Sequence, residues 1–153
     1  MNNKTNVKIK RLSEKCTIPT YGTEFSAGAD IYAAVENEND SNMIEIPAGE
    51  TRFINTGFAL EIPEGYVGLI YPRSGISCKC GLALANKVAV IDSDYRGEVM
   101  IALHNHSKES RYVTTTDRIA QLIIQPVQQI DFIESDELSE AGRGNGGFGS
   151  TGK

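Results

Sequence analysis

The chain has 153 residues, of which 40% are hydrophobic and 23% charged, and its formal net charge is −5 at pH 7. This length suits one domain that buries roughly two-thirds of its unfolded surface, and the composition excludes wholesale disorder and fibrous repeats. The acidic balance, with a sequence pI near 5.1, argues against a broad basic surface for duplex nucleic acid or for an anionic membrane.

The sequence also bears on the compartment. The N-terminus, MNNKTNVKIK, is polar and basic, and no apolar run approaches the ~18 residues of a membrane-spanning helix. The cysteines, Cys16, Cys78 and Cys80, are odd in number, and the closest two are separated by one residue, so a disulfide framework is not expected. We therefore expect a cytoplasmic protein that contacts neither membranes nor, directly, nucleic acid.

Six stretches with a two-residue apolar rhythm predict strands, because they are rich in β-branched or aromatic residues and are bounded by turn residues. In chain order they are residues 7–12, 44–49, 52–62, 66–72, 98–106 and 118–127. No window of helical length keeps an amphipathic stripe, and the best helical segment is a turn or two within residues 74–84. Many short strands separated by turns predict an all-β fold, a jelly-roll-like barrel or sandwich.

The strand pattern stops near the C-terminus. From about Glu134 the sequence ESDELSEAGRGNGGFGSTGK is acidic and then glycine-rich, so it cannot bury a core of its own. We predict a domain over residues 1–133 and a flexible glycine-rich arm over residues 134–153. The arm matches G-x-G-x-x-G and G-x-x-x-x-G-K, but both patterns require a preceding strand and a following helix, which are not predicted here.

Two stretches in the first half of the chain contain polar or charged residues that an ordinary strand or turn would not need. In AGADIYAA, Asp30 lies in an apolar run, where a carboxylate needs partners; it either caps a turn or belongs to a site. In YPRSGIS, Arg73, Ser74 and Gly75 offer donors that suit a phosphate, and a simple turn explains the same residues equally well.

The densest stretch is NKVAVIDSDYRGEV, which follows LALA. Asn86 and Lys87 could turn a hairpin between LALA and VAVI. Asp92 and Asp94 would lie on one side of a continuing strand, where one of them could act as a general base. An acidic turn that opens the next strand is the alternative.

Two later stretches also carry candidate residues. In TTTDRIAQLII, Arg118 and Gln121 interrupt an apolar run, as residues of an edge strand would also do. Four residues of the arm have side chains that could contact a ligand, and they lie among its glycines: Arg143, Phe148, Ser150 and Thr151. An aromatic side chain can stack on a nucleic-acid base, whereas a terminus that is only flexible has no need of an aromatic residue.

Two other kinds of site are not expected. Cys78 and Cys80 are two residues apart, as are His104 and His106, whereas structural zinc sites use C-x₂₋₄-C spacing. The chain has no G-x-S-x-G motif, and Ser74 has no evident histidine and aspartate partners, so a serine hydrolase is not expected either.

Taken in order, AGADIYAA, PRSGIS, NKVAVIDSDYRGEV, DRIAQLI and GRGNGGFGSTG resemble the five ordered motifs of the trimeric dUTP diphosphatase (dUTPase) family. The motifs are spaced across residues 27–152. The resemblance implies hydrolysis of dUTP to dUMP and diphosphate by attack of water on the α-phosphorus, with Mg²⁺ on the triphosphate. Such a reaction limits uracil in DNA and supplies dUMP for dTMP synthesis.

The resemblance implies a role for each motif. Asp92 would be the general base, and Asp30 would hold Mg²⁺-bound waters in the outer shell. Asn86 to Val90 would bind uracil, and Tyr95 would pack under the deoxyribose and exclude a 2′-hydroxyl. The residues that would bind the phosphates are Arg73, Ser74, Gly75 and Gln121.

The resemblance also implies a homotrimer, in which the arm of one chain closes the site of others. Phe148 would stack on uracil. The other arm residues that would bind substrate are Arg143, Gly149, Ser150 and Thr151. One departure is visible: Ala89 stands where many members have glycine, which would strain the uracil-binding segment if its backbone were left-handed.

Two other functions are open to a fold of this kind. A deoxycytidine triphosphate deaminase resembles the family in fold and phosphate contacts, but the aspartate motif and the glycine-rich arm both favour the diphosphatase. A regulatory or binding protein on the same fold would be expected to lack Asp92 or the arm, and this sequence has both.

Overall fold

The structure is a computed structural model in which residues 5–36 and 41–147 are described. In this part of the chain there are twelve short strands and one short helix, which confirms the predicted all-β fold. No helix among the described residues is both long enough and apolar enough to cross a bilayer.

The elements follow one another closely along the chain. The first six strands are β1 (Lys8–Arg11), β2 (Thr20–Tyr21), β3 (Ala29–Tyr32), β4 (Met43–Ile46), β5 (Thr51–Ile54) and β6 (Phe58–Glu61). The remaining elements are β7 (Tyr66–Tyr71), α1 (Ser74–Cys80), β8 (Leu82–Leu84), β9 (Ala89–Ile91), β10 (Ile101–Asn105), β11 (Arg111–Thr114) and β12 (Arg118–Pro126).

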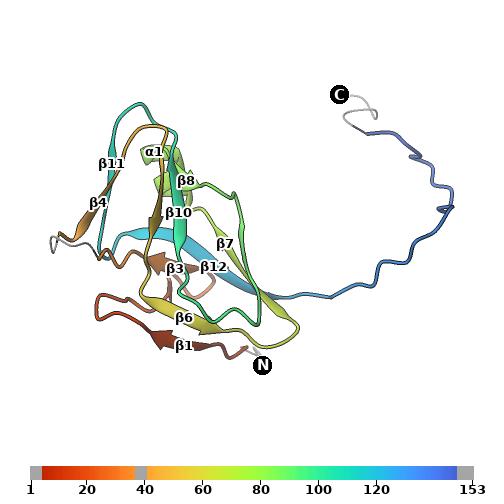
Figure 1. Cartoon of the computed structure of the whole chain (residues 1–153), viewed down its shortest axis with the longest axis horizontal. Helices are drawn as coiled ribbons and strands as arrows, with labels where there is room; N and C mark the ends of the chain where they lie inside the picture. Colours follow the sequence, from red (N-terminus) through yellow and green to blue (C-terminus); the bar gives the residue numbers. More distant parts are fainter. Residues whose placement is uncertain (1–4, 37–40, 148–153) are drawn as a thin grey trace.

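The strands form two main sheets. The larger has the order β2-β3-β12-β7-β9, and all of its neighbours are antiparallel. In the second sheet β10 lies between β5 and β8, while β1 pairs with β6 and β11 with β4. Most of these pairs join strands that are distant in sequence, and Figure 1 shows them gathered into one body. This arrangement agrees with the expected sandwich of short antiparallel strands.

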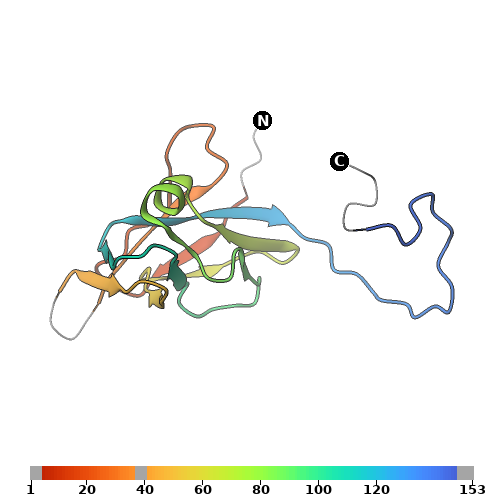
Figure 2. The same cartoon turned by 90° about the horizontal axis from the view of Figure 1, so that it is seen from above.

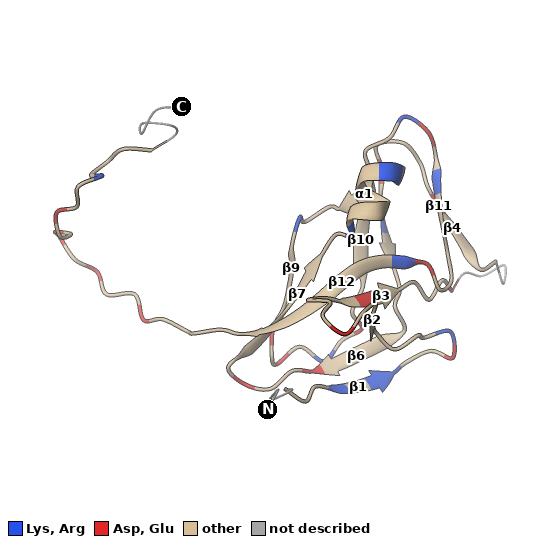
Figure 3. Cartoon of the chain, turned by 180° about the vertical axis from the view of Figure 1, so that it is seen from behind, with Lys and Arg blue, Asp and Glu red and all other residues tan. Residues whose placement is uncertain are grey.

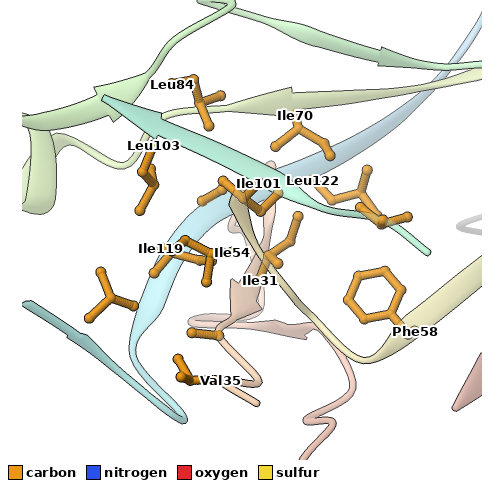
Figure 4. Packing of buried hydrophobic residues seen from close by; sticks show 14 of the residues in the cluster. Ile31, Val35, Ile54, Phe58, Ile70, Leu84, Ile101, Leu103, Ile119 and Leu122 are labelled. Atoms are coloured by element: carbon orange, nitrogen blue, oxygen red, sulfur yellow. The ribbon is translucent and has the colours of Figure 1, made fainter. Parts of the chain in front are cut away.

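The core lies between the two sheets, as Figure 4 shows. In β10, Ile101 and Leu103 are buried, whereas Ala102 and His104 between and after them are only half-buried. This two-residue period puts one face of the strand on the core. Each fully buried aliphatic side chain contributes roughly 1.5–3 kcal/mol, so a shift of one residue in pairing would be strongly unfavourable.

One predicted strand, over residues 52–62, is wrong as a single element. The structure divides it into β5, which pairs with β10, and β6, which pairs with β1. Gly57 lies between them with φ of 71°, and a Cβ at this position would lie 2.9 Å from Cys16 Cβ. A left-handed glycine without room for a side chain ends one strand and redirects the chain into the other.

The short helix predicted within residues 74–84 is confirmed as α1. It begins after Arg73, whose backbone is extended (φ −95°, ψ 135°), and it ends at Gly81 with φ of 70°. Glycine adopts this left-handed conformation at little cost, which makes it a common helix terminator. Cys78 and Cys80 are exposed on α1, whereas Cys16 is buried, and burial raises the pKa of its thiol.

The predicted hairpin at Asn86 and Lys87 is wrong in its pairing. A turn is present, since Lys87 N donates to Leu84 O (3.2 Å) and Lys87 has φ of 64°. However, β8 pairs with β10 and β9 pairs with β7, so the turn connects the two sheets. Leu82 and Leu84 are both buried, and β8 keeps them in the core by pairing with β10 in the second sheet.

The chain leaves the body after β12. Val127 N donates to Gly65 O (2.9 Å), and residues 128–147 then contain neither strand nor helix. Figures 1 and 2 show this segment extending away from the sheets. Phe132, Ile133 and Leu138 are about nine-tenths exposed on it (90%, 89% and 91%). Regular structure therefore ends several residues before the predicted domain boundary at residue 134.

Candidate active site

Two of the predicted site residues lie side by side on the larger sheet. The register places Asp30 on β3 opposite Gln121 on β12, and Gln121 opposite Tyr71 on β7. Opposed residues of antiparallel strands point to the same face, and the adjacent row, with Ala29 and Leu122, faces the core. Asp30 and Gln121 thus interrupt their apolar runs for one reason: they point to the outer face.

Two guanidinium groups hold the Asp30 carboxylate. Arg73 Nε donates to Oδ1 at 2.7 Å, and Arg118 Nη1 donates to Oδ2 at 3.2 Å. The Asp30 side chain is only 11% exposed, so its charge would be costly without these partners. Arg73 Nη1 also donates to Arg118 O at 3.3 Å. Asp30 therefore positions both arginines and joins the sheet to the start of α1; Figure 3 shows β3, β12 and α1 together.

A pocket of about 460 Å³ lies beside this ion-pair cluster, and we call it the arginine pocket. Its lining residues are Gly22, Thr23, Ser26, Ala27, Gly28, Asp30, Arg73, Ser74, Gly75, Arg118 and Gln121. It thus brings together all four predicted phosphate-binding residues of the body and the predicted outer-shell residue Asp30. These groups combine positive charge, a hydroxyl and an amide, which is the chemistry of an anion site.

Two glycines shape the arginine pocket in different ways. A Cβ on Gly28 would lie 2.8 Å from Gln121 Oε1, so Gly28 leaves room for the glutamine, whose Nε2 donates to Pro72 O (2.9 Å). A Cβ on Gly75 would meet no atom within 4 Å. Gly75 thus leaves open space in the first turn of α1, where backbone N–H groups have no partner within the helix.

The sequence singled out Arg118 as a charged residue in an apolar run but gave it no role in the site, and it did not single out Thr23 or Ser26. The signal for Arg118 was its place at the start of the strand that carries Gln121, and the contact with Asp30 gives it a role. Thr23 and Ser26 close a turn on the pocket rim, where Thr23 N donates to Ser26 Oγ at 2.9 Å. Nothing in the local pattern distinguishes these hydroxyls from those of an ordinary loop.

A second pocket, of about 320 Å³, contains the residues predicted to bind uracil and deoxyribose, and we call it the tyrosine pocket. Its lining residues are Phe53, Asn86, Ala89, Val90, Ile91, Tyr95, Glu98, Val99 and Met100. None of them lines the arginine pocket. One chain therefore does not bring the two groups of predicted residues into a single pocket.

Tyr95 is held in a tight turn. Its N–H donates to Asp92 O at 3.2 Å, and its hydroxyl donates to Glu98 O at 2.9 Å. A Cβ on Gly97 would lie 2.7 Å from Tyr95 Cζ, so the ring needs glycine at this position. Arg96 closes the turn, because its Nη1 donates to Ser93 O at 2.6 Å and to Tyr95 O at 2.9 Å.

The alanine that departs from the family motif is not strained. Among the described non-glycine residues, Lys87 and Thr116 are those with positive φ, so Ala89 does not have a left-handed backbone. Ala89 pairs with Ile70 in the larger sheet. A methyl group is therefore accommodated where many members have glycine.

Asp92 lies directly after β9, in the turn that leads to Tyr95. Its side chain is exposed and has no hydrogen-bond or ion-pair partner within residues 5–36 and 41–147. It lines neither pocket. The carboxylate is thus free to accept a proton, but the described part of one chain does not place it beside the arginine pocket.

The arm residues are only partly described. Arg143 lies in a turn, where its Nε donates to Gly146 O at 3.0 Å. The other arm residues predicted to bind substrate lie outside the described residues: Phe148, Gly149, Ser150 and Thr151.

The donor set does not form a cage for a metal ion. In the described ranges no three histidine, cysteine, aspartate or glutamate side chains gather as metal ligands. In the arginine pocket Asp30 is the one carboxylate, and each of its oxygens already accepts from an arginine. This set fits a cation that arrives bound to a triphosphate, since Mg²⁺ usually keeps several waters and binds substrate phosphates.

The dUTPase family profile matches residues 14–152 of this chain. The chain is 45% identical over 147 residues to the deoxyuridine 5′-triphosphate nucleotidohydrolase of Nautilia profundicola, covering 96% of this chain and 99% of the relative. It is 42% identical over 148 residues to the enzyme of that name from Anaplasma marginale, covering 95% and 97%.

Solved structures agree with these relatives. A variant of the Staphylococcus bacteriophage 80alpha dUTPase with dUpNHpp matches with a TM-score of 0.86 at 28% identity, covering 98% of this chain and 100% of that one. A variant dUTPase from phage phi11 of S. aureus, described with a structural Mg(II) ion, matches with a TM-score of 0.78 at 25% identity, covering 89% and 100%. The family profile, the curated relatives and the fold agree, and the chain therefore belongs to the dUTPase family.

Proposed function

We propose that this protein hydrolyses dUTP to dUMP and diphosphate. The observation that carries the proposal is the arginine pocket, where Arg73 and Arg118 are fixed by the nearly buried Asp30 beside Ser74 and the open backbone of Gly75. Preorganised cations and donors of this kind stabilise the charge of a triphosphate during reaction. Family membership specifies the nucleotide.

In the proposed reaction a water oxygen forms a bond to the α-phosphorus, and the bond from that phosphorus to the bridging oxygen of the diphosphate breaks. Asp92 orients the water and takes its proton, which its exposed and unpaired carboxylate is free to do. The diphosphate leaves with the bridging oxygen. Arg73, Ser74 and Gln121 hold the phosphates while charge redistributes.

Mg²⁺ bound to the triphosphate would supply charge neutralisation. Asp30 would contact its water shell, because each carboxylate oxygen has a second lone-pair site besides the one that accepts from an arginine. In this assignment Asp30 both positions the arginines and orients the hydrated cation.

We assign the base and the sugar to the tyrosine pocket. The segment from Asn86 to Val90 would bind uracil, in part through backbone groups, and Tyr95 would pack under the deoxyribose. Packing of this kind leaves no room for a 2′-hydroxyl, so the ring would discriminate against UTP.

We further propose a homotrimer with shared sites. Its support is the separation of the arginine pocket from the tyrosine pocket, since each holds one part of the predicted constellation. The segment after Val127 supports the same arrangement, because it extends away from its own sheets (Figure 2). Arg143, Phe148 and the residues to Thr151 would then close a site formed by neighbouring chains. A cytoplasmic location would suit an enzyme of the nucleotide pool.

One assay tests the proposed function against its alternatives. With Mg²⁺ present, we expect diphosphate release from dUTP and far slower release from dCTP, dTTP and UTP. Ammonia released from dCTP would instead identify a deaminase. Nucleotide binding without any product would identify a regulatory protein on the same fold.

The Tyr95→Ala variant tests the sugar assignment. Removing the ring should open space under the sugar, and the dUTP/UTP ratio of kcat/KM should fall by about tenfold or more. Steady-state kinetics with both nucleotides would measure the ratio. An unchanged ratio would contradict the place assigned to Tyr95.

A further inference from the structure

Glu98 lines the tyrosine pocket, and the proposed reaction leaves it without a role. Its carboxylate accepts three hydrogen bonds from the loop between β5 and β6. Thr56 N and Gly57 N donate to Oε1 at 3.2 and 2.8 Å, and Asn55 Nδ2 donates to Oε2 at 2.9 Å. We call residues 55–57 the anchor loop.

The anchor loop is itself tightly held. Thr56 is fully buried, and its Oγ1 donates to Val99 O at 2.6 Å. Leu12 N donates to Gly57 O at 2.7 Å, and Gly57 has no room for a side chain against Cys16. The loop thus offers Glu98 a fixed point in the body, because several segments of the chain constrain it.

Glu98 also holds Tyr95 through its main chain. The Tyr95 hydroxyl donates to Glu98 O at 2.9 Å, although the tyrosine as a whole is 44% exposed. The ring lies against Gly97 on one side and is otherwise half-exposed, so this hydrogen bond helps to fix its orientation. The side chain of Glu98 therefore accepts hydrogen bonds from the anchor loop, while its backbone carbonyl accepts one from the Tyr95 hydroxyl.

We propose that Glu98 is a positioning residue: by tying its backbone to the anchor loop, it fixes the Tyr95 ring and thereby sets discrimination between deoxyribose and ribose. The inference rests on the proposed function, because the tyrosine pocket must receive the sugar. It differs from a purely structural role, which would alter stability and overall activity but not the preference between two sugars.

A double-mutant cycle tests the proposal. Glu98→Ala, Tyr95→Phe and the double variant are compared with the unmodified protein by the dUTP/UTP ratio of kcat/KM. Each single change should lower the ratio by about fivefold, the size expected for one hydrogen bond. The double variant should lower it no further than the larger single effect, because both changes release the same ring. Independent, multiplying effects would overturn the proposal.

Two further variants separate positioning from stability. Glu98→Gln keeps an acceptor for the two backbone N–H groups and should restore most of the ratio. Thr56→Val removes the bond from Thr56 Oγ1 to Val99 O in the same loop but leaves the donors to Glu98 intact. It should lower the Tm without changing the ratio. A ratio that falls as far in Thr56→Val as in Glu98→Ala would refute a specific role for Glu98.

The same proteins are also titrated with dUDP and UDP by calorimetry. The affinity ratio reports sugar discrimination without turnover. If the protein does not hydrolyse dUTP, the proposed function is refuted, but the affinity ratio still tests the role of Glu98. If Glu98→Ala does not fold, Asn55→Ala replaces it in the cycle, since it removes one of the three bonds to the carboxylate. An unchanged affinity ratio in folded Glu98→Ala or Asn55→Ala would contradict the proposal.

Discussion

Asp92→Asn should lower kcat for dUTP hydrolysis by roughly 10²–10⁴-fold, the usual contribution of a general base. Asparagine has nearly the same size as aspartate but cannot accept the proton of the attacking water. The Asp92 side chain is exposed and has no partner in the described ranges, so the exchange should not disturb the fold. Affinity for a non-hydrolysable analogue such as dUpNHpp should change little. Single-turnover rates and calorimetry would separate the two effects.

Asp94→Asn is the matched control. Asp94 is also exposed, lies two residues further along the same turn and lines neither pocket. We expect its kcat to stay near that of the unmodified protein. Full turnover in Asp92→Asn, together with a collapse in Asp94→Asn, would transfer the role of base to Asp94.

Deletion of residues 143–153 should lower kcat/KM by about 10²-fold or more while the body remains folded. Residues 143–147 follow the last strand, and the backbone bonds in this region stay local, from Gly144 N to Ala141 O and from Gly146 N to Arg143 O. Removing them leaves the core untouched. The lost lid should nevertheless admit water and remove contacts to base and phosphates. Thermal melts, light scattering and steady-state kinetics would measure stability, assembly and activity.

A full-length variant whose residues 143–153 are replaced by a glycine-serine chain is the matched control for length, and it should be as inactive as the deletion. Mixing gives a sharper test of shared sites. Refolding the deletion variant together with full-length Asp92→Asn should restore part of the activity, because some sites then combine a normal Asp92 with an arm from another chain. Full activity of the deletion variant alone would refute the lid. Failure to regain activity in mixed assemblies would refute shared sites.

Several residues that line the arginine pocket stood out in the sequence because they break local patterns. Asp30 and Gln121 interrupt apolar runs, and both prove to point away from the core. The contacts of Asp30 were not predictable, since Arg73 and Arg118 are 43 and 88 residues away in the chain. For the same reason Arg118 was not assigned to the site. Tyr95 was assigned by the family motif, whereas its bond to Glu98 O depends on the fold of the turn.

Local sequence patterns account for the features that depend on neighbouring residues: the two-residue burial period of β10, the short helix before Gly81, and the end of regular structure before the glycine-rich arm. Alternation and the conformational freedom of glycine act within a few residues, so a local pattern records them. The pairing of the strands, in contrast, depends on the fold of the whole chain. In the fold, β8 pairs with β10 and β9 pairs with β7, so the two strands do not form a hairpin. The predicted substrate-binding residues of the body are divided between the arginine pocket and the tyrosine pocket. Such pairings are set by the burial of a shared core and the closure of long loops, which no local stretch of sequence encodes.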